Sequence, residues 1–205
     1  MVGMLVNEYK VRLVETSDSE SILAIYKPYV TDHTISFEYE VPNLKEFTER
    51  IRMIALDYPY IVCLENDKVI GYAYASLYRS RRAYQWGVES TIYMHETSHG
   101  KGLAGILYNT LFSMLKIQGY LNVYAVISLP NPKSKGFHKS LGFEEIGVFK
   151  NVGYKFNSWH DVQWMDLHLG EHPNKPDVVK KWVDMKNSNE INLLLDNRNT
   201  QLQNL

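Results

Sequence analysis

The spacing of hydrophobic and polar residues predicts seven strands. Alternation over residues 9–14 indicates a first strand, and two runs around Asn66-Asp67 indicate an antiparallel hairpin. Residues 86–94 and 122–129 are rich in β-branched and aromatic residues, which favour strands. The predicted strands cover residues 9–14, 60–64, 69–75, 86–94, 122–129, 143–156 and 162–169, and residues 34–40 form a short extended piece.

Helical spacing appears between these strands. Ser17, with Glu20 three residues later, predicts a capped helix that ends at Pro28. Asn43 with Glu46 predicts a second capped helix. Apolar residues recur every three or four positions over residues 102–118, and residues 131–142 form a short helix. This order predicts an α+β protein with α/β/α layers, in which a mixed, mostly antiparallel central sheet has helices on both faces.

The character of the chain changes near residue 171. Two prolines in residues 172–176 are typical of a linker, and asparagine and glutamine dominate from residue 187. Apolar residues at 178, 179, 182, 183 and 185 allow an amphipathic helix that docks on the domain or a partner; the alternative is a disordered tail. We therefore divide the chain into a domain at residues 1–170 and a C-terminal extension at residues 171–205.

Composition narrows the environment of the protein. A net charge of −1 over 205 residues favours neither nucleic acid nor an anionic membrane as a partner. Cys63 is the single cysteine, which suits a reducing compartment. No basic segment followed by an apolar run opens the chain, and no apolar run reaches the ~20 residues that span a bilayer. We expect a cytoplasmic protein without a metal site.

The stretch from Val88 to Leu115 carries the strongest chemical signal. His99-Gly-Lys-Gly-Leu-Ala104 lies where a predicted strand turns into a helix. The first N–H groups of a helix have no partner within it, glycine lets an anion approach the backbone, and Lys101 adds a cation. The stretch predicts a cradle for a phosphate or pyrophosphate; the alternative is a tight turn that only joins strand to helix.

Several ordered motifs resemble one enzyme family. Gly100-Lys-Gly-Leu-Ala104, Asn131 and Leu141-Gly-Phe143 together resemble the GNAT superfamily of acyl-CoA N-acyltransferases. Further stretches are similar to its phosphinothricin and methionine sulfoximine acetyltransferase branch, over about residues 9–169: Thr34-Ile-Ser-Phe37, Arg81-Arg-Ala-Tyr-Gln-Trp86, Val88-Glu-Ser-Thr-Ile-Tyr93, Ala125-Val-Ile-Ser-Leu-Pro-Asn131, Gly153-Tyr-Lys155 and Trp159-His-Asp-Val162.

The resemblance implies acetyl-CoA as acetyl donor. The cradle would hold its pyrophosphate, the strand backbone would pair with its pantetheine arm, and Asn131 would bond that arm or merely cap a helix. His99 departs from the Gln or Arg usual in the family, and Ala104 replaces a common glycine. The implied donor-binding residues are Ile92, Tyr93, Met94, His99, Gly100, Lys101, Gly102, Leu103, Ala104, Gly105, Asn131 and Ser134.

An amine is protonated at neutral pH and must lose a proton before it attacks a thioester. The resemblance places Glu89 as the base, directly or through water, and partial burial would raise its pKa. The alternative is a structural carboxylate paired with Arg81 or a backbone N–H. The N–H of Met94 would donate to the oxyanion.

The thiolate leaving group gains from a proton, and His138 stands where many relatives carry a tyrosine. We expect it to act as leaving-group acid or in a base relay; a surface histidine is the alternative. His160 is a third candidate for proton transfer, with a packing role favoured.

Arginine side chains bind carboxylate and phosphinate oxygens through a planar fork, so we expect Arg79, Arg81 and Arg82 to bind the acid group of the acceptor. The alternative is a basic loop that is only solvated. A core role for Phe37 is equally open. The expected substrate-binding residues are Thr34, Phe37, Arg79, Arg81, Arg82, Tyr84, Glu89, Ser90, Thr91 and Tyr154.

The sequence thus predicts acetylation of the α-amine of a small amino-acid analogue, by direct attack in a ternary complex, in a homodimer, an activity associated with antibiotic or herbicide resistance. Two rivals stay open: a protein or peptide N-acetyltransferase, which needs an open groove, and a silent acyl-CoA-binding sensor whose tail binds a partner.

Overall fold

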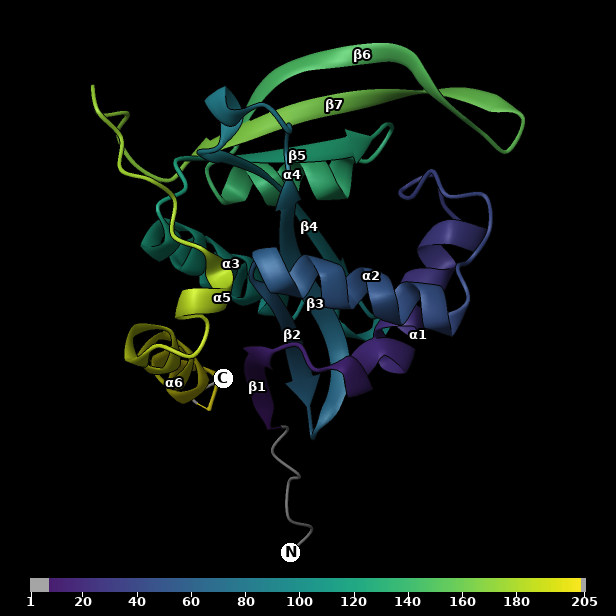
Figure 1. Cartoon of the computed structure of the whole chain (residues 1–205). Coiled ribbons are helices and arrows are strands. Elements are labelled where there is room, and N and C mark those ends of the chain that lie inside the picture. The colour runs from purple at the N-terminus through teal and green to yellow at the C-terminus, as the bar shows by residue number, and fades with distance from the viewer. Residues whose placement is uncertain (1–7, 204–205) are drawn as a thin grey trace, which may run out of the picture.

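A computed structural model describes residues 8–203, and the outer ends of both predicted parts, residues 1–7 and 204–205, lie outside it. Seven strands form one sheet in the order β1-β2-β3-β4-β5-β7-β6 (Figure 1). Only the β4–β5 pair is parallel. The strands are β1 (Tyr9–Leu13), β2 (Tyr60–Glu65), β3 (Lys68–Leu77), β4 (Gly87–Met94), β5 (Asn122–Ser128), β6 (Glu144–Lys155) and β7 (Ser158–His168).

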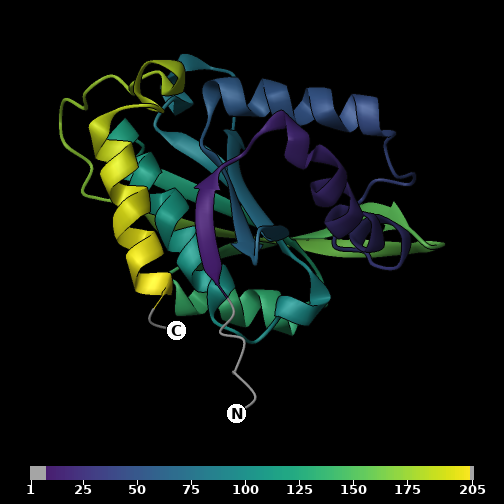
Figure 2. The same cartoon turned by 90° about the horizontal axis from the view of Figure 1, so that it is seen from below.

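Helices cover both faces of the sheet, which confirms the predicted fold class (Figure 2). One core joins α1 and α2 to β2 and β3, and the other joins α3 to the opposite face of the same strands. The longer helices are α1 (Ser19–Thr31), α2 (Leu44–Asp57), α3 (Leu103–Gln118), α4 (Pro132–Ser140) and α6 (Asn189–Leu202), and short helices are η1 (Thr16–Asp18), η2 (Arg82–Tyr84), η3 (Glu96–Ser98) and α5 (Trp182–Met185).

The helix ends show which local signals were correct. The predicted Asn43 cap is confirmed, since its side chain accepts from the Glu46 N–H at 3.0 Å. Pro28 does not end α1, which continues to Thr31. The proline removes one hydrogen bond in the last turn, and burial of Val30 offsets the loss. Residues 34–40 form bends rather than a strand.

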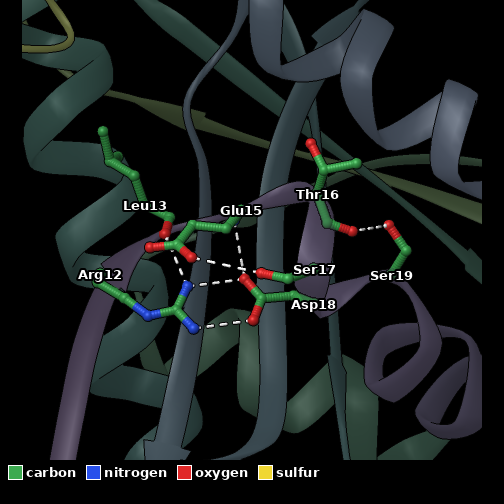
Figure 3. Close-up of polar contacts among 7 residues, drawn as sticks. All are labelled: Arg12, Leu13, Glu15, Thr16, Ser17, Asp18 and Ser19. Carbon is green, nitrogen blue, oxygen red and sulfur yellow. Dashed lines mark hydrogen bonds and ion pairs between the residues drawn. The ribbon is translucent and has the colours of Figure 1, made fainter.

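The start of α1 differs from the prediction. Ser17 is exposed and does not cap the helix. Instead, the buried Asp18 accepts from the Glu15 N–H at 2.8 Å and from both terminal nitrogens of Arg12 at 2.7 and 2.8 Å (Figure 3). A fixed Arg–carboxylate fork from the preceding strand outweighs a local serine cap.

This pair predicts a pH-dependent stability. Burial alone would raise the pKa of Asp18, but the Arg12 guanidinium and the Glu15 N–H lower it below 3.8. The stabilisation is present above the unfolded-state pKa and is lost as the pH falls through the lower folded-state pKa. We expect Asp18→Asn to reduce the unfolding free energy by about 2 kcal/mol at pH 7. Urea unfolding at pH 7, 5 and 3 should show the gap closing in acid; a gap independent of pH would contradict this.

The C-terminal extension folds onto the sheet edge. The predicted amphipathic helix shrinks to α5, where Trp182 is buried and Val178 stays exposed. The longer helix is α6, which packs against β1 and α3, with Ile191 and Leu202 buried (Figure 2). The Asn/Gln-rich composition hid this helix because its apolar residues are few. The division at residue 170 stays a prediction.

Asn199 of α6 covers the backbone of edge strand β1. Its Oδ1 accepts from the Val11 N–H at 2.7 Å, and its Nδ2 donates to the Val11 carbonyl at 3.1 Å. We expect Asn199→Ala to reduce the unfolding free energy by about 2 kcal/mol, because two buried backbone groups lose their partners. Chemical denaturation beside Asn197→Ala, an exposed neighbour on α6, measures this. Equal stability of the two variants would show that the bonds contribute little.

Candidate active site

The predicted anion cradle forms between β4 and α3. Gly100 and Gly102 have φ of +77° and +76°, which other residues rarely adopt, and Gly102 is the N-cap of α3. A Cβ built at Gly100, Gly102 or Gly105 meets no atom within 4 Å, so the space before the helix is open. The N–H groups at the start of α3 that lack an intrahelical partner are the kind of donors that bind an anion.

Next to the cradle, β4 and β5 separate. Their parallel pairing covers only residues 87–89 of β4. The His95 N–H bonds the Ile70 carbonyl, so by antiparallel alternation the backbone groups of Ser90, Ile92 and Met94 point away from β3, toward the gap. A groove of about 610 Å³ follows this edge to the cradle, and a smaller cavity of about 130 Å³ continues it between β4 and β5. We call the two together the β4 groove.

Most predicted donor-binding residues line the β4 groove. They are Ile92, Tyr93, Met94, His99, Gly100, Gly102, Ala104, Asn131 and Ser134. Asn131 lines the groove and also caps α4, since its Oδ1 accepts from the Ser134 N–H at 3.0 Å. The two roles weighed from the sequence therefore coexist geometrically.

Three predicted donor-binding residues are not part of the groove lining. Leu103 is buried in the core, and Gly105 lies inside the first turn of α3, beside the groove lining. The Lys101 ammonium donates to Glu65 at 2.9 Å and lies over the Tyr9 ring. The Lys101 cation, which was expected at the cradle, is thus paired with the Glu65 carboxylate of β2 outside the groove lining.

The structure adds groove residues that sequence reasoning missed. The Tyr29 hydroxyl donates to the Met94 carbonyl at 2.6 Å and lies 3.4 Å from Nε2 of His99. Ser98 and Ser128 line the groove with buried hydroxyls that have no partner among residues 8–203. Tyr29 comes from α1, distant in sequence, so no local motif could have identified it.

Glu89 projects from the middle of β4. By strand alternation it shares a face with Thr91 and Tyr93, and Tyr93 packs against Tyr26 and Tyr29 of α1. Burial raises the pKa of the half-buried Glu89, and the charge of Arg79 opposes that rise. Within residues 8–203 Glu89 makes no salt bridge, so the pairing with Arg81 that the sequence left open is absent there.

His138 is buried rather than on the helix surface, which removes the surface alternative. Its Nδ1 donates to the Ser134 carbonyl at 2.8 Å, and its ring packs between Tyr108 and Phe143. Burial lowers the pKa of His138, so the neutral form prevails at pH 7, with Nε2 as an acceptor. His160 bonds the Lys155 carbonyl at 2.9 Å, as expected for a packing role.

A loop and a hairpin border the Glu89 face. Phe37 of the α1–α2 loop presses on Gly153 of β6, where a Cβ would lie 2.4 Å from its ring. Lys155 is 2% exposed and donates to the carbonyls of Val30, His33 and Ser36 at 2.6, 3.0 and 2.7 Å. The loop that carries Thr34 is therefore fastened to the hairpin that carries Tyr154.

The arginines that we expected to bind the acceptor lie far from the cradle. Arg79, Arg81, Arg82 and Tyr84 are exposed and line another cavity, of about 540 Å³, at the opposite end of β4. Eight residues of strand separate the two ends by roughly 23 Å. The charge of Arg79 lowers the pKa of Glu89. Arg81 and Arg82 do not join the cradle.

Among residues 8–203, no group of three metal-ligating side chains could hold an ion, and no helix is long and apolar enough to cross a membrane.

Comparisons with known proteins decide the family. The model of the acetyltransferase (GNAT) domain matches residues 11–164. The chain belongs to the GNAT acetyltransferase family. This confirms the resemblance and identifies the protein as an enzyme.

The relatives agree with that family. The chain is 33% identical to phosphinothricin N-acetyltransferase of Streptomyces viridochromogenes over 83% of this chain and 93% of that one. It is 32% identical to L-methionine sulfoximine/L-methionine sulfone acetyltransferase of Salmonella typhimurium, over 79% and 95%. A crystal structure of a phosphinothricin acetyltransferase from Sinorhizobium meliloti in complex with acetyl-CoA superposes with a TM-score of 0.79 at 35% identity, covering 83% and 94%.

Proposed function

We propose that the enzyme transfers acetyl from acetyl-CoA to the α-amine of a small amino-acid analogue of the phosphinothricin or methionine sulfoximine type. The observation that carries this proposal is the β4 groove, in which glycines at a helix start adjoin an unpaired strand edge. A carboxylate of raised pKa, that of Glu89, lies on the same strand outside the groove lining. Relatives that act on phosphinothricin and methionine sulfoximine support the acceptor class.

The groove residues fit acetyl-CoA. The N–H groups at the start of α3 would hold its pyrophosphate, and the backbone of Ile92 and Met94 would pair with its pantetheine arm. The unpartnered hydroxyls of Ser98 and Ser128 offer further hydrogen bonds. The thioester supplies the electrophilic carbonyl, and we assign the Met94 N–H as donor to the oxyanion, because it points away from β3 toward the gap.

Glu89 acts as the general base in this proposal, directly or through one water. Its raised pKa brings the carboxylate closer to the working pH, which improves proton abstraction from the acceptor ammonium. Attack is direct, because Cys63 is 1% exposed and burial raises its pKa to about 12, which leaves no thiolate for an acyl intermediate.

His138 is better suited to a relay than to the leaving-group acid. A neutral ring whose Nδ1–H is engaged by Ser134 offers only Nε2, and that nitrogen accepts a proton. We therefore propose that it takes part in the proton path beside the groove that it lines.

The acceptor binds on the Glu89 face in this proposal. Thr91 lies on the same face, while Ser90 faces the other core, where its hydroxyl donates to the Tyr124 carbonyl at 3.4 Å. Thr34, Phe37 and Tyr154 border the site from the fastened loop and hairpin, and Arg79 attracts the acid group of the acceptor. The protein or peptide alternative requires an open acceptor groove, and it would hold only if this loop did not close over the site.

Thiol release from acetyl-CoA tests the proposal. The panel contains phosphinothricin, methionine sulfoximine, methionine sulfone, free amino acids and peptides with free N-termini. We expect turnover on the first three compounds. Turnover only on peptides would replace the proposal by peptide acetylation, and acetyl-CoA binding without turnover on any amine would favour the sensor.

We also propose a homodimer through β6. This edge strand exposes Ile146, Phe149 and Val152, each by more than half, where edge strands usually carry charges. A second copy that covers β6 would bury this apolar strip. Sedimentation should give twice 23.9 kDa, and Phe149→Lys should shift the mass to the monomer while Leu193→Lys on α6 should not. A monomeric wild type would refute the dimer.

A further inference from the structure

The C-terminal extension closes a cationic cavity. The cavity of about 540 Å³ at the Gly87 end of β4 has the β3–β4 loop on one side and residues 179–183 on the other. We call it the extension cavity. The extension cavity and the β4 groove have no lining residue in common.

The wall from the extension is held in place by backbone bonds. The Lys180 N–H donates to the Gln118 carbonyl at 2.8 Å, and Nε2 of Gln118 donates to the Lys180 carbonyl at 3.0 Å. Trp182 is 2% exposed and fixes the next turn in the core. The Trp86 indole also donates to the Asp177 carbonyl at 2.8 Å. The wall is therefore built into the fold.

Positive charge dominates the lining. Five cations surround the cavity and face one carboxylate, that of Asp57: they are Arg79, Arg81, Arg82, Lys180 and Lys181. All five are exposed, and none takes part in a salt bridge within residues 8–203. Since the whole chain has a net charge of −1, this concentration of unpaired cations is local.

Arginine forks and lysine ammonium groups around a concave site suit oxyanions with more than one charge. A cavity of this volume accommodates a small organic molecule. Tyr58 and Tyr120, which stack at 6.4 Å, provide an apolar wall for its carbon skeleton.

We propose that the extension cavity is a second binding site, for a small multivalent organic anion that carries carboxylate or phosphate groups. The site is distinct from the donor cradle, which lies at the other end of β4. Its ligand contacts Lys180 and Lys181 from the extension and Arg81 and Arg82 from the loop. Gly87 lines the cavity two residues before Glu89, so an occupant lies next to the strand of the proposed base.

Calorimetric titration of the full chain tests this site. Citrate represents carboxylates and pyrophosphate represents phosphates, each titrated with and without saturating CoA, which occupies the cradle. We expect at least one anion to bind with CoA present, and Lys180→Ala/Lys181→Ala to weaken that binding by about tenfold or more. The matched control, Lys175→Ala/Lys186→Ala, removes the same charge from the extension outside the cavity and should leave the affinity within about twofold.

Three results would overturn the proposal: no binding of either anion, binding that CoA abolishes, or equal affinity in both double variants. Binding of a glutamate-rich peptide without binding of either small anion would instead make the cavity a protein-docking surface. CoA binding is measured in the same titrations, so failure of the second site is distinguishable from failure of the proposed function.

Discussion

Glu89→Gln is expected to lower kcat on the best amine of the panel by about 10²–10⁴-fold, the range that general bases contribute. Glutamine keeps the shape of the side chain but cannot take the ammonium proton. Because burial raises the pKa of Glu89, the wild-type rate should rise with pH through a value above 4.5, and the variant should lose that acidic limb. Steady-state rates between pH 4.5 and 9 measure both effects.

Glu144→Gln, an exposed change on β6, is the matched control and should keep the wild-type rate. Calorimetry should give the same CoA affinity for both variants, since Glu89 does not line the cradle. A loss below about fivefold, or a loss that follows weaker CoA binding, would remove Glu89 from the role of base.

Lys155→Met should be the most destabilising single change among those considered. The ammonium satisfies three backbone carbonyls, and it is 2% exposed. Methionine fills the same volume but leaves the carbonyls unpaired, so we expect the unfolding free energy to fall by about 3–5 kcal/mol. The KM for the acceptor should rise, because the fastened α1–α2 loop borders the Glu89 face.

Lys150→Met on the same strand is the control. Lys150 pairs with Asp161 at the surface, where such a pair contributes at most about 1 kcal/mol. Guanidinium unfolding of the two variants measures the difference. If both lost the same small amount, water would have to satisfy the three carbonyls, and the loop would not depend on the lysine.

Features encoded by adjacent residues could be predicted from the sequence. Strand alternation, the Asn43 cap and the glycine turn between β4 and α3 each depend on neighbours within a few positions, and the structure confirms all three. The extent of the predicted strand 162–169 was short by four residues at its start, because the exposed Trp159 and the polar residues beside it break the apolar pattern.

Features that depend on distant partners could not be predicted. Arg12 donates to Asp18 where a Ser17 cap was expected, and the Lys101 ammonium donates to Glu65. The Tyr29 hydroxyl reaches the groove from α1 and donates to the Met94 carbonyl. The arginine loop shows the same limit: its composition indicates an anion partner, but only the folded chain shows that residues 179–183 of the extension line the same cavity.

The asymmetry of the two sheet edges has a consequence for assembly. Asn199 already occupies the hydrogen-bonding groups of Val11 on β1, whereas β6, the opposite edge of the sheet, has no helix of the described chain along it that plays this part. A sheet with two free edges can add molecules at both sides and grow into a fibre. With one edge capped by its own chain, a pairing through β6 is complete after two molecules. If the protein pairs through β6 as proposed, the Asn199 bonds to Val11 would oppose further pairing at β1, and variants at Asn199 would weaken that protection.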